Sequence, residues 1–167
     1  MKKIVIFLMA ISLVFASEAK NFVLNEITGK KIHIEINKSG VKVKEFPKKI
    51  IILDFFGKNC PPCRAEMPIL GEIQSKYKKD LQIIGVHVQE PLTIKDYSII
   101  KNRGVNFPVA DYIQNQNFVE YISNLTGWQG MIPYMLFFDK NGTYEGYHLG
   151  MMEEETLEKI IEKIKKR

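Results

Sequence analysis

The stretch Asp54-Phe-Phe-Gly-Lys-Asn-Cys-Pro-Pro-Cys-Arg-Ala-Glu-Met-Pro68 decides how this chain of 167 residues is interpreted. It holds both cysteines of the sequence, Cys60 and Cys63, with two residues between them. The apolar run Ile50–Leu53 precedes it and predicts a buried strand, and a helical pattern follows it. Two sulfurs at this spacing, between a strand and a helix, indicate a redox dithiol.

The order of the two sulfurs along the chain predicts different roles for them. A thiolate is the attacking species, and an isolated cysteine with a pKa of about 8.5 is mostly protonated at neutral pH. Cys60 stands just before the helix, where free N–H groups and the helix dipole favour an anion. Pro61 suits the first helical turn, since its missing N–H would have no partner there. We expect Cys60 to attack and Cys63 to resolve the mixed disulfide.

Two carboxyl groups accompany the cysteines. Asp54 ends an apolar strand six residues before Cys60, so burial should raise its pKa. Glu66 lies three residues after Cys63, one helical turn further on the same face. Either carboxyl could accept the proton of the Cys63 thiol. Without a catalytic role, Glu66 would be an exposed helix acid, and Asp54 would be a strand-end acid bonded to nearby N–H groups.

The beginning of the chain has the pattern of a secretory signal peptide. Two lysines follow Met1, the run Ile4–Phe15 is apolar except for Ser12, and small residues follow. Cleavage after Ala16 or Ala19 fits the pattern, and an uncleaved N-terminal anchor is the alternative. We therefore predict a signal peptide in residues 1–19 and export to the periplasm.

Residues 20–167 have the length of one domain with one core. Cleavage after Ala19 lowers the formal charge from +5 to +4, and the lysines are scattered, so nucleic acid is not an expected partner. Export places the cysteine pair where disulfides persist. A bridge between cysteines this close constrains little chain, which favours a reactive site over a structural staple.

The remaining patterns predict a mixed α/β domain. Alternating polar and apolar residues in 21–44 indicate a hairpin or small meander. Further strands are expected at 50–56, 81–88, 134–138 and 143–149, with a short extended piece at 107–110. Helices are expected at about 61–79, 93–102, 114–125 and 153–166. Parallel strands with an antiparallel hairpin at the edge give a mixed central sheet flanked by helices.

The segment Ile51–Arg64 resembles the active-site segment of thioredoxins. Asp54 matches the buried acid of that family, and Pro68 matches the proline in its helix. Met131-Ile132-Pro133, just before a strand, resembles the family's cis-proline loop, which packs against the disulfide and receives the substrate backbone. The resemblance implies a thioredoxin-like fold, with substrate bound by Ile132, Pro133, Pro61 and Pro62.

In more detail, the chain is similar to the exported TlpA/ResA-type thioredoxins of bacteria. The pattern Cys-x-x-Cys-x-x-Glu-x-Pro, here Cys60–Pro68, is theirs, and their acid corresponds to Glu66. Phe22–Leu24 and Gly29–Ile32 resemble their N-terminal addition, which implies an N-terminal β extension. Gly104–Pro108 resembles their inserted segment.

This likeness implies a thiol–disulfide oxidoreductase with no cofactor beyond the Cys60–Cys63 disulfide. It also implies a monomer that reduces exported proteins with cysteine pairs, such as apocytochrome c, and takes electrons from a membrane donor of the DsbD/CcdA type. Three places depart from the family pattern: Asn59 replaces the usual tryptophan, Tyr134-Met135 replace small hydroxyl residues, and the pairing of residues 37–47 is uncertain.

Three alternatives remain open. The nearest is a DsbA-like oxidant or isomerase, which differs in the direction of electron flow. A copper- or zinc-binding module would need a histidine such as His148 beside both sulfurs. A non-catalytic adaptor is disfavoured by the intact dithiol with two acids. His33 is expected to be a solvated strand residue, His87 a core or strand-end histidine, and Trp128 a core or cleft aromatic.

Overall fold

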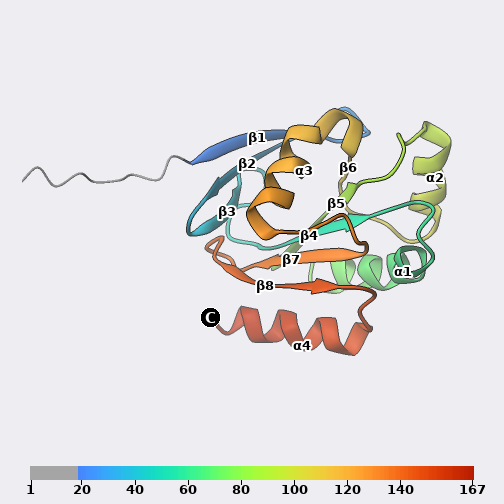
Figure 1. The fold of residues 1–167 in the computed structure, drawn as a ribbon. Coiled ribbons are helices and arrows are strands. Elements are labelled where there is room, and N and C mark those ends of the chain that lie inside the picture. Colours follow the sequence, from blue (N-terminus) through green and yellow to red (C-terminus); the bar gives the residue numbers. More distant parts are fainter. Residues whose placement is uncertain (1–18) are drawn as a thin grey trace, which may run out of the picture.

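The computed structural model describes residues 19–167, so the predicted signal peptide lies outside the described residues except for Ala19. Strands and helices follow one another along this range (Figure 1). In chain order they are β1 (Lys20–Asn25), β2 (Lys31–Asn37), β3 (Gly40–Val43), β4 (Ile50–Phe56), α1 (Pro61–Lys76), β5 (Leu81–His87), α2 (Ile94–Asn102), β6 (Val109–Asp111), α3 (Tyr112–Thr126), β7 (Tyr134–Phe138), β8 (Tyr144–Leu149) and α4 (Glu154–Lys165).

The central sheet has the strand order β6-β5-β4-β7-β8. Strands β4, β5 and β6 run parallel, whereas β7 and β8 form an antiparallel hairpin at the other edge. All seven residues of β4 are buried, because the strand is apolar on consecutive positions and is covered on both faces. The predicted mixed sheet flanked by helices is confirmed.

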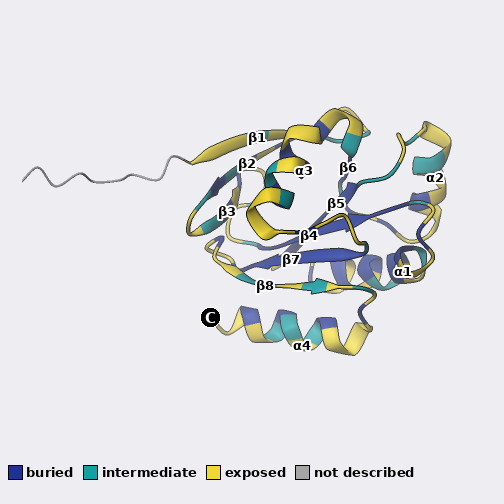
Figure 2. Ribbon diagram, in the orientation of Figure 1, coloured by how far each residue is buried: buried dark blue, intermediate teal, exposed yellow. Residues whose placement is uncertain are grey.

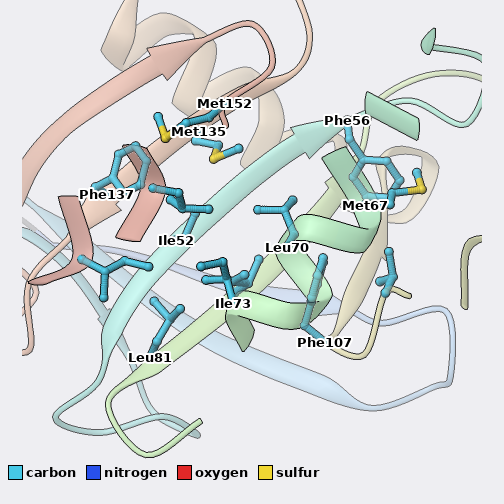
Figure 3. Close-up of a cluster of buried hydrophobic side chains, with 14 of the residues drawn as sticks. Ile52, Phe56, Met67, Leu70, Ile73, Leu81, Phe107, Met135, Phe137 and Met152 are labelled. Carbon is cyan, nitrogen blue, oxygen red and sulfur yellow. The ribbon is translucent and has the colours of Figure 1, made fainter. Parts of the chain in front are cut away.

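Helices α1 and α4 cover one face of this sheet (Figure 1). Their side chains meet those of the sheet in one cluster, in which Ile52 of β4, Leu70 of α1 and Met135 of β7 take part (Figure 3). Helix α4 buries Leu157, Ile161 and Ile164 and exposes its outer side (Figure 2). This apolar stripe recurs at helical spacing, which is why the sequence predicts the helix closely.

Helix α3 and the N-terminal sheet cover the opposite face. Strands β1, β2 and β3 form an antiparallel meander, which confirms the predicted β extension and shows that residues 40–43 pair with β2. The Phe22 ring meets Phe118 of α3 edge to face at a centroid distance of 5.4 Å. Bridges from Glu26 to Ala110 and from Gly40 to Thr143 tie the meander to β6 and to the β7–β8 hairpin.

Two helices differ from their predicted bounds. Helix α1 ends at Lys76 rather than near Lys79, because the N–H groups of Asp80 and Leu81 both donate to the Tyr77 carbonyl in a turn. Helix α3 begins at Tyr112, two residues early, with an irregular residue at Asn115. Tertiary contacts cause this irregularity: the Asn115 amide is hydrogen-bonded to both the N–H and the carbonyl of Asn25 in β1.

Within residues 19–167, none of the helices has the length and apolar character needed to cross a membrane.

A close contact joins α1 to the loop after α2. A Cβ on Gly71 would come within 2.1 Å of the Gly104 carbonyl oxygen, and a Cβ on Gly104 would lie 3.2 Å from the Cα of Pro68. Glycine at both positions therefore lets two backbones approach each other. The segment that resembles an insertion is held directly against the helix that carries the cysteines.

We predict that Gly71→Ala lowers stability by about 1–3 kcal/mol, because the new methyl group forces α1 away from Gly104. Helix propensity alone predicts the opposite, a gain of about 1 kcal/mol. Urea unfolding measures the difference. The neighbouring exposed change Glu72→Ala is the control and should stay within about 0.5 kcal/mol of the wild type. A Gly71→Ala protein as stable as the wild type would contradict the close approach.

Candidate active site

The two cysteines form a disulfide at the start of α1. Cys60 is the residue that caps the helix, in an extended conformation, and Pro61 and Pro62 occupy the first turn as predicted. The Cys63 N–H points at the Cys60 sulfur, with 3.3 Å between nitrogen and sulfur. A sulfur in this position receives an N–H of the first helical turn, which favours negative charge on it in the reduced protein.

The predicted proline loop lies against this disulfide. The Ile132–Pro133 peptide bond is cis, and the Ile132 carbonyl oxygen lies 3.9 Å from the Cys60 sulfur. Both sulfurs are nearly buried, whereas Pro61 and Pro62 are exposed beside them. The fold therefore brings all four residues predicted to bind substrate close to the disulfide, with Pro61 and Pro62 exposed, Ile132 partly exposed and Pro133 buried.

Trp128 anchors the proline loop. Its indole N–H donates to the Met131 carbonyl at 2.6 Å, and its ring stacks on Tyr134 with 5.4 Å between centroids. The side chain is buried, which favours the core aromatic over the cleft aromatic of the two interpretations. The sequence offers no signal for this hydrogen bond, because it depends on the shape of the turn at residues 129–131.

Asp54 is buried in the sheet beneath the helix. Ile52 and Phe56, two residues to either side of it on β4, belong to the cluster that faces α1 and α4, so Asp54 points to the same face. Its Oδ1 atom has no hydrogen-bond partner in the part of the chain that the structure describes. Burial raises the pKa of Asp54 well above its ordinary value, and the negative charge of Glu66 adds to the rise.

Glu66 is also buried, which excludes the exposed helix acid. Its Oε1 atom accepts a hydrogen bond of 2.7 Å from the N–H of Met152, which lies in the segment between β8 and α4. Burial raises the pKa of Glu66 to about 7, although the Met152 N–H acts in the opposite direction. Since the charges of Glu66 and Asp54 repel each other, the two predicted acids form one coupled pair.

Comparisons with known proteins identify the family of the chain. The family model described as "AhpC/TSA family" matches residues 16–145. The chain belongs to the AhpC/TSA family. As a member of this family it has the thioredoxin-like architecture that the cysteine segment and the proline loop predict.

Proteins named thiol–disulfide oxidoreductase ResA are similar to most of this chain. The protein from Bacillus thuringiensis subsp. konkukian is 32% identical over 151 residues, which cover 88% of this chain and 76% of the relative. The protein from Geobacillus kaustophilus is 31% identical over 151 residues, covering 89% and 77%. The chain is accordingly a thiol–disulfide oxidoreductase of the ResA type.

A solved structure confirms the thioredoxin fold. A thiol:disulfide interchange protein of the thioredoxin family from Chlorobium tepidum TLS superimposes with a TM-score of 0.71 at 23% identity. The match covers 89% of this chain and 95% of that protein.

The three histidines lie in different surroundings in this AhpC/TSA member. His33 is on the polar face of β2, as predicted, with its Nδ1 atom 2.6 Å from Glu45. The Nε2 atom of His148 lies 3.4 Å from the carbonyl oxygen of Met151. No group of three or more histidine, cysteine or acidic side chains within residues 19–167 is arranged to hold a metal ion.

His87 is fully buried at the end of β5. Its Nδ1 atom lies 3.1 Å from Asp111, and burial lowers its pKa although Asp111 opposes the shift. The Nε2 atom has no hydrogen-bond partner among residues 19–167. The predicted core histidine is thus only half satisfied, and its acidic partner could not be found from spacing because β6 is brought beside β5 only by the fold.

We predict that the Glu66 carboxyl makes stability depend on pH. Because its folded pKa of about 7 exceeds its ordinary value of 4.5, the native state holds the proton more tightly, and stability falls as pH rises through this window. Wild type should lose about 2–3 kcal/mol relative to Glu66→Gln between pH 5 and pH 8. The amide oxygen of the variant can still accept the Met152 N–H.

Chemical denaturation of both proteins across this pH range provides the measurement. Glu72→Gln removes an exposed carboxyl from the same helix and serves as the matched control, which should follow wild type. A constant difference between wild type and Glu66→Gln at every pH would show that the carboxyl is not perturbed.

Proposed function

We propose that this oxidoreductase is an exported reductant of protein disulfides, in which Cys60 attacks and Cys63 resolves. The observation that carries the proposal is the position of the disulfide. The Cys60 sulfur caps a helix next to the exposed Pro61 and Pro62 and beside the Ile132 carbonyl, and two buried carboxyls with raised pKa values lie on the inner side.

In the first step the Cys60 thiolate attacks one sulfur of a substrate disulfide. A bond forms between Cys60 and that sulfur while the substrate S–S bond breaks, and the departing thiolate takes a proton. Cys63 then loses its proton and attacks the Cys60 sulfur, which forms the Cys60–Cys63 disulfide and releases the second substrate thiol. Two electrons and two protons pass from the protein to the substrate.

The carboxyl pair supplies the base for the second step. Near neutral pH the coupled pair holds one proton readily, since two adjacent buried charges repel each other. Glu66, with a pKa of about 7, is the group that exchanges a proton near neutral pH. Burial and the charge of Glu66 also raise the pKa of Asp54, so this carboxyl is the second group of the pair that can take up the proton.

The substrate backbone is received by Ile132 and Pro133, next to Pro61 and Pro62 in the first turn of α1. Ile132 and the two exposed prolines leave an apolar edge against which an extended segment can lie. Trp128 acts indirectly, because its hydrogen bond to Met131 positions the loop that contacts the substrate.

Trapping tests the assigned roles of the cysteines. We expect Cys63→Ala to accumulate mixed disulfides with a peptide disulfide through Cys60, because the resolving thiol is gone. Mass spectrometry of the proteolysed adduct identifies the linked cysteine. Adducts that form readily through Cys63 in a Cys60→Ala variant would reverse the assignment.

The two acids should control resolution. Asp54→Asn and Glu66→Gln are each expected to slow the second step by about 10- to 100-fold at neutral pH, since general base catalysis contributes about that much or more. Stopped-flow kinetics of mixed-disulfide decay from pH 5 to pH 9 provides the measurement. If both variants keep the wild-type pH profile, the carboxyl pair is not the base.

The direction of electron flow, the cellular site and the partners belong to the same proposal. Residues 1–19 act as a signal peptide and deliver residues 20–167 to the periplasm as a monomer. Apocytochrome c is the proposed substrate, and a membrane donor of the DsbD/CcdA type re-reduces Cys60 and Cys63. The likeness to ResA-type oxidoreductases supports this assignment.

The reduction potential of the Cys60–Cys63 pair distinguishes a reductant from an oxidant. Equilibration with glutathione buffers, followed by thiol alkylation, should give a value near that of thioredoxin, about −270 mV. A value close to about −120 mV would instead identify a DsbA-like oxidant and overturn the proposed direction.

A further inference from the structure

A small pocket lies between the start of α1 and helix α2, directly beside the redox pair. Its volume is about 180 Å³. Three cations and one acid line it, and apolar side chains of the two helices complete it: Lys58, Arg64, Arg103, Asp96, Met67 and Ile100. The pocket therefore combines an apolar wall with a cationic rim.

The positive charge of this pocket is only partly neutralised from within. Lys58 is paired with Asp96 at 2.9 Å and lies 3.7 Å from Glu90. The Lys58 ammonium, followed by Thr93, holds the pKa of Asp96 well below its usual range, so this acid stays charged. Neither Arg64 nor Arg103 forms an ion pair with any residue of the described range, and both side chains reach solvent.

The pocket is built into the active-site segment. Lys58 directly precedes Asn59 and Cys60, and Arg64 directly follows Cys63. The Asn59 N–H donates to the Gln89 side chain at 2.9 Å, and the Asn59 amide donates to Glu90. These bonds fix the rim on the loop before α2, so the cationic groups are already placed before a substrate arrives.

We propose that this pocket binds a carboxylate side chain of the substrate protein, close in sequence to the cysteine that Cys60 attacks. The inference rests on the proposed function and adds a substrate class to it. Arg64 and Arg103 present guanidinium groups, which bind carboxylates through paired N–H donors. Met67 and Ile100 line the pocket where the methylene groups of a glutamate would lie.

The position of Asn59 indicates on which side of the redox pair the substrate carboxylate would bind. The polar Asn59 and Lys58 occupy the surface before Cys60, where a tryptophan would offer an apolar platform. On the side of the proline loop, Met131 is 60% exposed. A substrate segment with an acidic residue on one flank of its cysteine and apolar residues on the other would match both sides.

Two peptides test the inference. Each carries one cysteine as a thiopyridyl mixed disulfide, whose leaving group is uncharged, and they differ only in having glutamate or glutamine residues beside the cysteine. Reduced protein attacks the peptide sulfur through Cys60 and releases pyridinethione, which is followed by absorbance. We expect the glutamate peptide to react about fivefold faster at low ionic strength, and the ratio to fall as salt is added.

Arg103→Gln supplies the variant, since this side chain is distant in sequence from both cysteines and only its backbone caps α2. The glutamate preference should fall by at least half in this variant. Lys101→Gln removes the same charge two residues away, outside the pocket, and should keep the wild-type preference.

The outcomes separate the pocket from the proposed function. Equal rates for the two peptides, or a preference that Lys101→Gln abolishes as fully as Arg103→Gln, would overturn the pocket while exchange chemistry stands. Absence of exchange with both peptides would overturn the proposed function, and the pocket inference with it.

Discussion

The burial of β4 on both edges and both faces is the constraint on which the site depends. Pairing with β5 on one side and β7 on the other holds this strand in the centre of the sheet. Its end therefore delivers Cys60 to the start of α1, and β7 delivers Pro133 to the same edge. Asp54, two residues from the end of the strand, is buried with it.

This burial also explains the electrostatics of the site. Two carboxyl groups in one apolar interior disfavour each other's charge, and neither has a cationic partner within residues 19–167. Such an arrangement destabilises the fold at high pH, since the carboxyl protons must be given up in a low dielectric. Placed beneath a dithiol, the same arrangement offers a base whose pKa is close to neutrality.

Outside the buried centre, the surface around the disulfide has two distinct sides. The proline loop, braced by Trp128, provides an apolar edge that suits an extended backbone. The pocket beside α2 provides the guanidinium groups of Arg64 and Arg103, which form no ion pair with other residues of the range 19–167. In the proposed function, chemistry and selectivity are thus separated: the carboxyls would act from beneath the sulfurs, and recognition would take place on the exposed flanks.

Much of this could be predicted from local patterns. The apolar run Ile50–Phe56 predicted the bounds of β4, and the apolar stripe of α4 predicted the bounds of that helix, in both cases nearly to the residue. Such patterns succeed because the periodicity of buried positions is a short-range property. The errors arose where distant contacts override the pattern. Asn115 leaves helical geometry to bond with β1, and Gly71 is held close to Gly104, which the helix pattern does not reveal.

The sequence by itself determined the redox pair, its place at a helix start, the acids near it and the family to which the chain belongs. Only the tertiary structure decided which distant groups meet them. The Ile132 carbonyl is 72 positions from Cys60, and the Met152 N–H is 86 positions from Glu66. These contacts follow from the order of strands in the sheet and from the packing of α1, which local spacing does not encode.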